Sequence, residues 1–322
     1  MNLLTRNETA RWLTERDDYC ILTHSRPDGD TLGTAVALCL GLRKLGKQAF
    51  VLENPETPCR YSSLAQGLTV SAPLPGSTLV CVDVAAPRML PSSFRSWENS
   101  IALRIDHHAS ASSFTEAELV DKTAAACGEI LYDVLMELGV ALDKAIATAL
   151  YIAVSTDTGC FRFANTTEHT FLVAAACTAA GADIYGLNQI LFETLSLPRL
   201  RIQGWITENT RLQNEGRLAV CAIPRSVEDS LGVTEDDMDN ISSFLRTIAG
   251  VEMAALLREN RDGSIKLSLR AIPGYDAGAI CARFGGGGHA GAAGATLYTP
   301  LADAAAAVEN AMLEAQNRSR EL

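Results

Sequence analysis

Ile101-Ala102-Leu103-Arg104-Ile105-Asp106-His107-His108 runs from apolar residues into an acid and two of the five histidines in this chain of 322 residues. A short apolar run of this kind is typical of a buried strand. Two further runs also end in polar side chains, because residues 19–23 lead into His24 and residues 78–82 lead into Asp83. Ligands bind at the carboxyl ends of strands in open α/β sheets. The three runs therefore predict a site at one edge of a parallel sheet.

The polar residues at these strand ends suit a divalent metal ion. His24-Ser25-Arg26-Pro27-Asp28-Gly29-Asp30 leads into an amphipathic helix pattern, and Ser155-Thr156-Asp157-Thr158-Gly159 follows an apolar one. Oxygen and imidazole ligands without thiolates are typical of sites for ions such as Mn²⁺. Taken singly, Asp28-Gly29-Asp30 is also typical of a surface turn, and Asp83 or Asp157 of a helix cap.

Taken together, these residues form a candidate ligand set for two metal ions. The six candidates are His24, Asp28, Asp30, Asp83, His107 and Asp157. Six ligands suit two divalent ions if one carboxylate bridges them. Two ions about 3.5–4 Å apart stabilise both the attacking and the leaving oxygen in phosphoryl transfer. The set therefore predicts hydrolysis at phosphorus.

Strand-like and helical patterns alternate in the N-terminal half, which predicts βαβ units around a parallel sheet with helices on both faces. The predicted strands cover residues 20–23, 48–52, 79–82 and 101–105, and the predicted helices cover residues 31–45, 124–138, 144–154, 168–180 and 184–195. A long helix over residues 199–213 follows. Beyond it we predict strands over 217–223, 251–259 and 264–270, helices over 235–249, 277–284 and 301–316, and a hairpin turn at Asn260-Arg261-Asp262-Gly263.

These patterns predict an α/β protein with a smaller α+β domain at its C-terminus. We expect a catalytic domain over residues 1–195, a connecting helix over 196–216 and a second domain over 217–322, with the active-site cleft between the two domains.

Composition limits the class of protein. The net charge of −11 argues against a protein that coats long nucleic acid, although a small anionic substrate is compatible with it. The apolar windows at residues 145–154 and 171–182 are too short to cross a bilayer, and residues 1–18 have no signal-peptide pattern. Nine cysteines without a C-x-x-C pair indicate a reducing compartment, so we expect a cytoplasmic protein without a membrane partner.

Phe284-Gly285-Gly286-Gly287-Gly288-His289-Ala290-Gly291-Ala292-Ala293-Gly294 is a second informative string. It is a candidate for a helix or a phosphate loop. Backbone without side chains lets amides approach a phosphate closely, with Arg270 and His289 completing an anion site. Tight packing of the backbone is the alternative reason for the glycines.

In this order, the motifs resemble those of the DHH phosphoesterase superfamily, and within it the group of bifunctional oligoribonucleases and pAp phosphatases. Residues 24–33 resemble the first motif, Asp83 the second, and Ser155-Thr156-Asp157-Thr158-Gly159 the fourth. Asp106-His107-His108 is the triplet that names the superfamily. Residues 285–289 and 292–294 are similar to the signature of the DHH-associated C-terminal domain.

The resemblance implies roles for individual residues. One Mn²⁺ would be held by His24, Asp28 and Asp83, and the other by Asp30, Asp83, His107 and Asp157. His108 would face the scissile phosphate, and Asp106 would orient the histidines. The far end of the substrate would be bound by Arg270, Gly286, Gly287, Gly288 and His289.

We therefore expect a Mn²⁺-dependent phosphoesterase that cleaves short oligonucleotides to mononucleotides and dephosphorylates the nucleotide bisphosphate pAp. Water activated by the two ions would attack phosphorus, while His108 stabilises charge or protonates the leaving oxygen. A phosphodiesterase for cyclic di-AMP or its linear product pApA is the alternative. A homodimer is one option for its assembly.

Three other classes fit less well. A family-II inorganic pyrophosphatase shares the metal motifs but has a different C-terminal domain. A processive single-strand exonuclease would need a further basic domain. A regulator that only binds nucleotides would not need six competent ligand residues.

Overall fold

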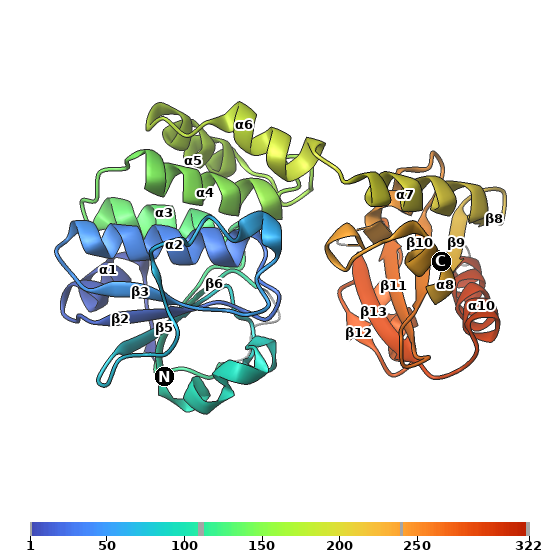
Figure 1. Cartoon of the computed structure of the whole chain (residues 1–322), viewed down its shortest axis with the longest axis horizontal. Helices are drawn as coiled ribbons and strands as arrows, with labels where there is room; N and C mark the ends of the chain where they lie inside the picture. The colour runs from blue at the N-terminus through green and yellow to red at the C-terminus, as the bar shows by residue number, and fades with distance from the viewer. Residues whose placement is uncertain (1, 109–112, 239–240, 320–322) are drawn as a thin grey trace. The chain divides into compact units, whose positions relative to one another are not determined.

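The computed structural model describes residues 2–108, 113–238 and 241–319. In this part of the chain, no helix combines the length and the apolar character needed to cross a membrane. The chain divides into two compact units, Met1–Thr194 and Leu195–Leu322 (Figure 1). The cleft and the connecting segment that we predicted between two domains stay predictions.

The first unit is built on a seven-stranded sheet whose strands are all parallel. In spatial order, its strands are β1 (Asn2–Leu3), β7 (Ala117–Val120), β6 (Ile101–Asp106), β5 (Thr78–Val82), β2 (Tyr19–Leu22), β3 (Ala49–Leu52) and β4 (Thr69–Val70). The chain runs outward from β2 to β4 on one side and from β5 to β7 on the other. The direction of winding therefore switches between β2 and β5, which is where open α/β sheets bind ligands. The predicted α/β class with a parallel sheet is confirmed.

Helical segments cover both faces of this sheet. The α-helices lie against one face and are α1 (Arg6–Thr14), α2 (Gly29–Lys44), α3 (Cys127–Glu137), α4 (Lys144–Asp157), α5 (Glu168–Ala179) and α6 (Ile184–Asn188) (Figure 1). A π-helical turn, Gln189–Glu193, follows α6. On the other face, Cys20 and Leu22 of β2 pack against Leu90 and Phe94. Leu90 directly follows the 3₁₀ helix η2 (Pro87–Met89), and Phe94 lies in the 3₁₀ helix η3 (Ser92–Ser100). A further 3₁₀ turn, η1, covers Cys59–Tyr61. Because both faces are covered, β2 and β3 are apolar along their whole length.

Two glycines bring α2 and α4 into close contact. A Cβ atom at Gly33 would lie 2.4 Å from the carbonyl oxygen of Ala149, and one at Gly29 would lie 2.4 Å from Oγ1 of Thr156. Any side chain at either position would force the two helices apart. The glycines therefore hold the N-terminus of α2 against the C-terminal turn of α4.

The second unit contains a six-stranded mixed sheet. In spatial order its strands are β12 (Gly287–Gly288), β13 (Ala292–Leu297), β11 (Ile265–Ala271), β10 (Met253–Glu259), β9 (Leu218–Ile223) and β8 (Arg211–Gln213). Its α-helices are α7 (Leu197–Asn209), α8 (Arg225–Leu231), α9 (Ala277–Ala282) and α10 (Leu301–Ser319). Leu218 and Val220 face the core that contains α10, whereas Ala219 and Cys221 face the core that contains α7. The predicted hairpin turn joins β10 to β11, with Asn260 and Ser264 paired through their backbones.

Two predictions in the second unit were wrong. Residues 235–249 do not form one α-helix: two 3₁₀ segments, η5 (Asp236–Met238) and η6 (Ile241–Thr247), take their place, and residues 239–240 lie outside the described part. Serine is disfavoured inside a helix because its hydroxyl can bond to nearby backbone, and this segment contains Ser242 and Ser243. Ile241 and Leu245 pack into the core. The helix predicted to reach residue 213 ends at Asn209, because residues 211–213 pair with β9.

The glycine- and alanine-rich string forms the hairpin β12–β13, not a helix. A Cβ atom at Gly286 would lie 2.1 Å from the carbonyl oxygen of Gly294, and Gly288 has a φ of +145° that side chains disfavour. Close approach of two strands therefore explains these glycines, in line with the packing alternative.

We predict that Gly33→Ala destabilises the first unit by about 1–3 kcal/mol, because the added methyl group meets backbone that cannot move away cheaply. Urea unfolding followed by circular dichroism measures the change. Gly204→Ala in α7 is the matched control, since a Cβ atom there meets nothing within 4 Å. The control should be stabilised by about 0.5–1 kcal/mol. Equal stability of Gly33→Ala and the wild type would contradict the packing argument.

Candidate metal centre and active site

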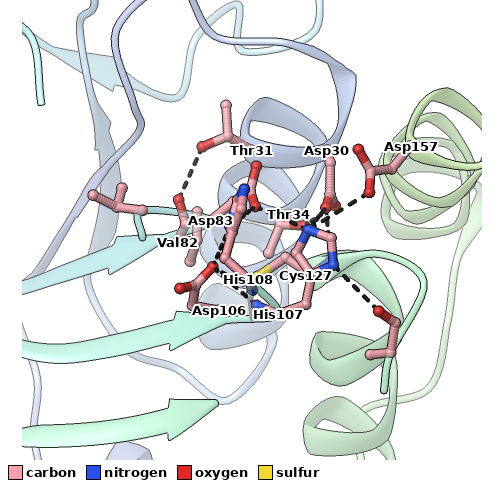
Figure 2. A network of polar contacts seen from close by, with 12 residues as sticks. Asp30, Thr31, Thr34, Val82, Asp83, Asp106, His107, His108, Cys127 and Asp157 are labelled. Atoms are coloured by element: carbon pink, nitrogen blue, oxygen red, sulfur yellow. Dashed lines mark hydrogen bonds and ion pairs between the residues drawn. The ribbon is translucent and has the colours of Figure 1, made fainter. Parts of the chain in front are cut away.

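The six predicted metal ligands lie in one cluster at the carboxyl edge of the first sheet, where the winding switches. His24 follows β2, Asp83 follows β5 and His107 follows β6. Asp28 and Asp30 lie at the start of α2, and Asp157 is the last residue of α4. Figure 2 shows Asp30, Asp83, His107 and Asp157 converging from these separate elements. The contact between α2 and α4 is thus what brings Asp157 to the cluster.

Asp83 lies between two groups of side chains. Its Oδ2 atom is 3.5 Å from Nε2 of His24, which is itself 3.6 Å from Oδ1 of Asp28. Its Oδ1 atom is 3.4 Å from Nε2 of His107. Nε2 of His107 is also 3.5 Å from Oδ2 of Asp157 and 3.8 Å from Oδ2 of Asp30. Potential ligand atoms lie within 4.8 Å of one another in three triplets, which are His24, Asp28 and Asp83, then Asp30, His107 and Asp157, and finally Asp83, His107 and His108.

The tautomers of the two histidines leave their Nε2 atoms available as ligands. Nδ1 of His24 is 2.8 Å from the carbonyl oxygen of Ser25, and Nδ1 of His107 is 3.2 Å from that of Ala124. A carbonyl oxygen only accepts hydrogen bonds, so each Nδ1 carries the donated proton. A neutral ring then presents its Nε2 lone pair to carboxylate oxygens.

Hydrogen-bond acceptor atoms of Asp83 and of the two histidines face one another, so a cation is needed between them. Oδ1 of Asp83 is buried and accepts no hydrogen bond from the residues that the structure describes. Buried polar atoms are almost always satisfied, so this oxygen indicates a missing positive partner. Four carboxylates with neutral histidines carry a charge of −4, which two divalent ions neutralise (−4 + 4 = 0). The residues present therefore fit a pair of divalent metal ions.

Protons occupy the cluster when metal ions do not. Burial lowers the pKa of His107, but Asp83, Asp30 and Asp157 outweigh it and raise that pKa to about 10. Burial raises the pKa of Asp157 to about 7. Burial, together with the charge of Asp83, also raises the pKa of Asp30 well above its usual range. Metal ions and protons therefore compete for the same atoms.

Asp30 is held rigidly by the beginning of α3. Its Oδ2 accepts a hydrogen bond from the backbone N–H of Cys127 at 2.6 Å. Its Oδ1 accepts one from the backbone N–H of Gly128 at 2.9 Å and one from the hydroxyl of Thr34 at 3.1 Å. The positive end of the α3 dipole partly offsets the buried charge. No local signal in the sequence pointed to Cys127 or Gly128 in this role, because they lie far along the chain from Asp30.

Asp28 is the N-cap of α2 as well as a candidate ligand, and does not belong to the surface turn that was its alternative interpretation. Its Oδ1 accepts hydrogen bonds from the backbone N–H groups of Asp30 and Thr31 at 3.0 and 3.1 Å. Capping leaves the second carboxylate oxygen for another partner. The roles of helix cap and metal ligand are therefore compatible at this residue.

His108 differs from the six candidate ligands in the partner of its Nδ1 atom. That atom is 2.7 Å from Oδ1 of Asp106, a fully buried carboxylate that also accepts the backbone N–H of His107 at 2.9 Å. Nδ1 of His108 is also 3.5 Å from Oδ1 of Asp83, but its proton is already donated to Asp106. The hydrogen bond to Asp106 raises the pKa of His108. The ring is thus positioned by Asp106 and presents Nε2 as its available atom.

In the second unit, the hairpin places His289 close to Arg270. Arg270 on β11 pairs with Ala292 on β13, and the backbones of Ala292 and His289 exchange hydrogen bonds of 2.8 and 3.2 Å. Burial and the charge of Arg246 lower the pKa of Arg270. Arg246 is thus a second cation near this site, and sequence analysis missed it. In the described part of the chain, no carboxylate forms an ion pair with Arg270.

Comparisons with known proteins follow the two-unit division. The family model of the DHH family, N-terminal domain, matches residues 18–154, and that of the DHHA1 domain matches residues 216–316. The bifunctional oligoribonuclease and PAP phosphatase NrnA of Thermus thermophilus is 32% identical over 282 residues, which cover 86% of this chain and 83% of that protein.

Two solved structures share the fold. An exopolyphosphatase-related protein from Bacteroides fragilis has a TM-score of 0.90 at 20% identity and covers 98% of this chain and 97% of its own. RecJ of Thermus thermophilus in complex with Mn²⁺ has a TM-score of 0.54 at 13% identity, covering 98% of this chain and 55% of RecJ.

We predict that Mn²⁺ binding to the metal-free protein at pH 7 releases about one proton or more, because ligands must be deprotonated to bind. The sign follows from the raised pKa values: His107 at about 10 is protonated at pH 7, and Asp157 at about 7 is half protonated. Metal affinity should therefore rise with pH between 6 and 8. Isothermal titration calorimetry in PIPES and in Tris, whose ionisation enthalpies differ, counts the protons. Identical heats in the two buffers would count against the cluster as the metal site.

Proposed function

The chain belongs to the DHH family, and we propose that it is a metal-dependent phosphoesterase that cleaves short oligonucleotides to mononucleotides and dephosphorylates pAp. The family makes it a phosphoric ester hydrolase. The relative from Thermus thermophilus is named for oligoribonuclease and PAP phosphatase activities. The observation that carries the proposal is the cluster around Asp83, whose acceptor atoms face one another and fit two divalent cations.

Each ion would have its own set of ligands, with Asp83 shared between them. His24, Asp28 and Asp83 would hold one ion, and Asp30, Asp83, His107 and Asp157 the other. We propose Mn²⁺, because the donors are carboxylates and imidazoles and because RecJ of this fold is described in complex with Mn²⁺. A bound pair of divalent ions supplies activation of water and neutralisation of charge on phosphate oxygens.

His108 would donate a proton to the substrate. Asp106 binds the Nδ1 proton and favours the protonated ring, so the second proton is held at Nε2. A proton at Nε2 can stabilise negative charge on a phosphate oxygen or pass to the leaving oxygen. Asp106 would keep the ring in this orientation and would not itself contact the substrate.

The second unit would bind the far end of the substrate. Arg270 has no acidic partner among the described residues, so its charge is available for an anion. His289 and the glycines Gly286, Gly287 and Gly288 line the same hairpin. A terminal phosphate group suits this combination of cations and accessible backbone. The acidic protein would thus bind a short anionic substrate through local positive charge.

We predict that Asp83→Asn abolishes hydrolysis, with a loss of activity of more than about a hundredfold. Mutation of residues that only hydrogen-bond to metal ligands already lowers activity by up to about a hundredfold, and Asp83 would be a ligand itself. The assay measures products from pAp, dinucleotides, short RNAs and a cyclic dinucleotide with the Mn²⁺-loaded protein. Asp183→Asn is the matched control, because Asp183 caps α6 and asparagine caps a helix equally well.

The substrate panel also separates the alternatives. Preference for the cyclic dinucleotide or its linear product would replace the proposed substrates with those of a cyclic-dinucleotide phosphodiesterase. No turnover of any substrate by the wild type would reject the proposal. Near-normal rates for Asp83→Asn would reject the shared carboxylate.

We predict that His108→Ala lowers kcat by about 10²–10⁴-fold, the usual contribution of proton transfer by a positioned side chain. The variant should still bind Mn²⁺ with the stoichiometry of the wild type, because His108 donates Nδ1–H to Asp106 and would face the substrate instead of a metal ion. Calorimetry and steady-state kinetics measure the two quantities. His169→Ala is the control, since His169 pairs with Asp133 away from the cluster. Loss of one metal ion in His108→Ala would show that His108 is a ligand.

A further inference from the structure

Arg104 is a charged side chain inside the parallel sheet of the first unit. It lies on β6, is 1% exposed, and is flanked by Cys81 on β5 and Glu118 on β7. Residues two apart on a strand share a face, so Arg104 and Asp106 project from the same side of β6. Arginine is almost never fully buried unless it is paired. This position therefore calls for a specific partner or a specific role.

The guanidinium of Arg104 connects three segments of the chain. Its Nη2 lies 2.8 Å from Oε2 of Glu118 on the neighbouring strand. Its Nη1 lies 3.4 Å from Oδ2 of Asp106 and donates to the carbonyl oxygen of Ala85 at 3.2 Å, just after Asp83. Arg104 thus connects β6, β7 and the segment after Asp83 at the edge of the sheet where the candidate metal ligands lie.

Asp106 uses its two oxygens for different partners. Oδ2 faces Arg104. Oδ1 accepts the Nδ1–H of His108 (Figure 2). A carboxylate held at one oxygen has a fixed plane, and this plane sets the direction of the hydrogen bond at the other. The contacts therefore form a continuous path from Glu118 through Arg104 and Asp106 to His108.

We infer that Arg104, held by Glu118, is a positioning residue that fixes Asp106 and, through it, the imidazole of His108. The inference rests on the proposed function, in which His108 acts on the substrate. Arg104 itself lies beneath the site and does not reach the substrate. Its effect should therefore appear in the turnover step and not in substrate binding.

Stability and positioning can be separated at this ion pair. Removing one partner leaves a buried charge, whereas replacing both by uncharged side chains is often neutral for stability. Glu118 also accepts hydrogen bonds at Oε1 from the Ser113 hydroxyl at 2.7 Å and the Phe114 N–H at 3.1 Å. Glutamine keeps that acceptor, so Arg104→Met/Glu118→Gln removes the two charges of this pair and retains the bonds to residues 113 and 114. Asp106 keeps the hydrogen bonds that it accepts from His107 and His108.

A double-mutant cycle with His108 tests the inference. Arg104→Met/Glu118→Gln should lower kcat by about 10–100-fold and leave KM within about twofold of the wild type. In a His108→Ala background, the same two changes should cost no more than about twofold, because the ring that they position is absent. An equal loss in both backgrounds, or wild-type kcat in the double variant, would overturn the inference.

The second unit offers a matched control. Arg258 on β10 is also buried in a sheet, at 8% exposure, and its Nε is 2.7 Å from Oε1 of Glu228. Arg258→Met/Glu228→Gln should keep the wild-type kcat. If the Arg104 variant does not fold, Arg104→Lys keeps the charge but loses the fork-shaped geometry. Arg104→Lys should then show a partial loss of kcat, and full activity would contradict the inference.

A readout without turnover separates this inference from the proposed function. Long-range ¹H–¹⁵N NMR spectra of the Mg²⁺-loaded protein, recorded at a pH high enough to neutralise the His108 ring, report which ring nitrogen keeps the remaining proton. The wild type should show a proton fixed at Nδ1, and Arg104→Met/Glu118→Gln should show a mixture of tautomers. An unchanged tautomer in the variant would overturn the positioning role. A fixed tautomer in a wild type without any turnover would reject the proposed function and leave the positioning role intact.

Discussion

The mutual repulsion of four carboxylates at one edge of the first sheet is the constraint on which the rest of the unit depends. Asp30 and Asp83 are buried, and the Nε2 atoms of His24 and His107 point at carboxylate oxygens and not at donors. Such a cluster is unfavourable unless protons or metal ions supply positive charge. Anything that binds the folded state alone stabilises it, by about 2.7 kcal/mol at a concentration of 100 Kd. The unit is therefore expected to be more stable with its metal ions than without them.

The fold meets this constraint with backbone dipoles and close packing of helices. The first N–H groups of α3 bind Asp30, and those of α2 bind Asp28. Helix N-termini favour negative charge, so two acids are placed where the backbone partly compensates them. Gly29 and Gly33 then allow α4 to approach α2, which delivers Asp157 to the same place. Candidate ligands from two helices and three strand ends thus meet in one cluster.

Sequence reasoning could place the candidate ligands because their signals are local. His24, Asp83 and His107 each follow an apolar run, and parallel strands end at the same edge. The capping of α3 by Asp30 had no such signal, since 97 positions separate Asp30 from Cys127, whose backbone N–H it accepts. Helix α1 did carry one, the capping box of Thr5 and Glu8, which the sequence analysis did not use. The segment 235–249 has helical periodicity, but packing of its apolar residues on the sheet decides its actual form.

Asp30 also links the candidate metal site to the assembly of the fold. Its carboxylate caps α3 and faces His107, so the same oxygens serve secondary structure and the candidate metal site. Arg104 has a comparable position on the other side of the site, because it joins β6, β7 and the segment after Asp83. The cluster therefore exists only when the central strands, α2, α3 and α4 are all in place. Metal binding should in consequence report on the folding of the whole first unit and not on a local loop.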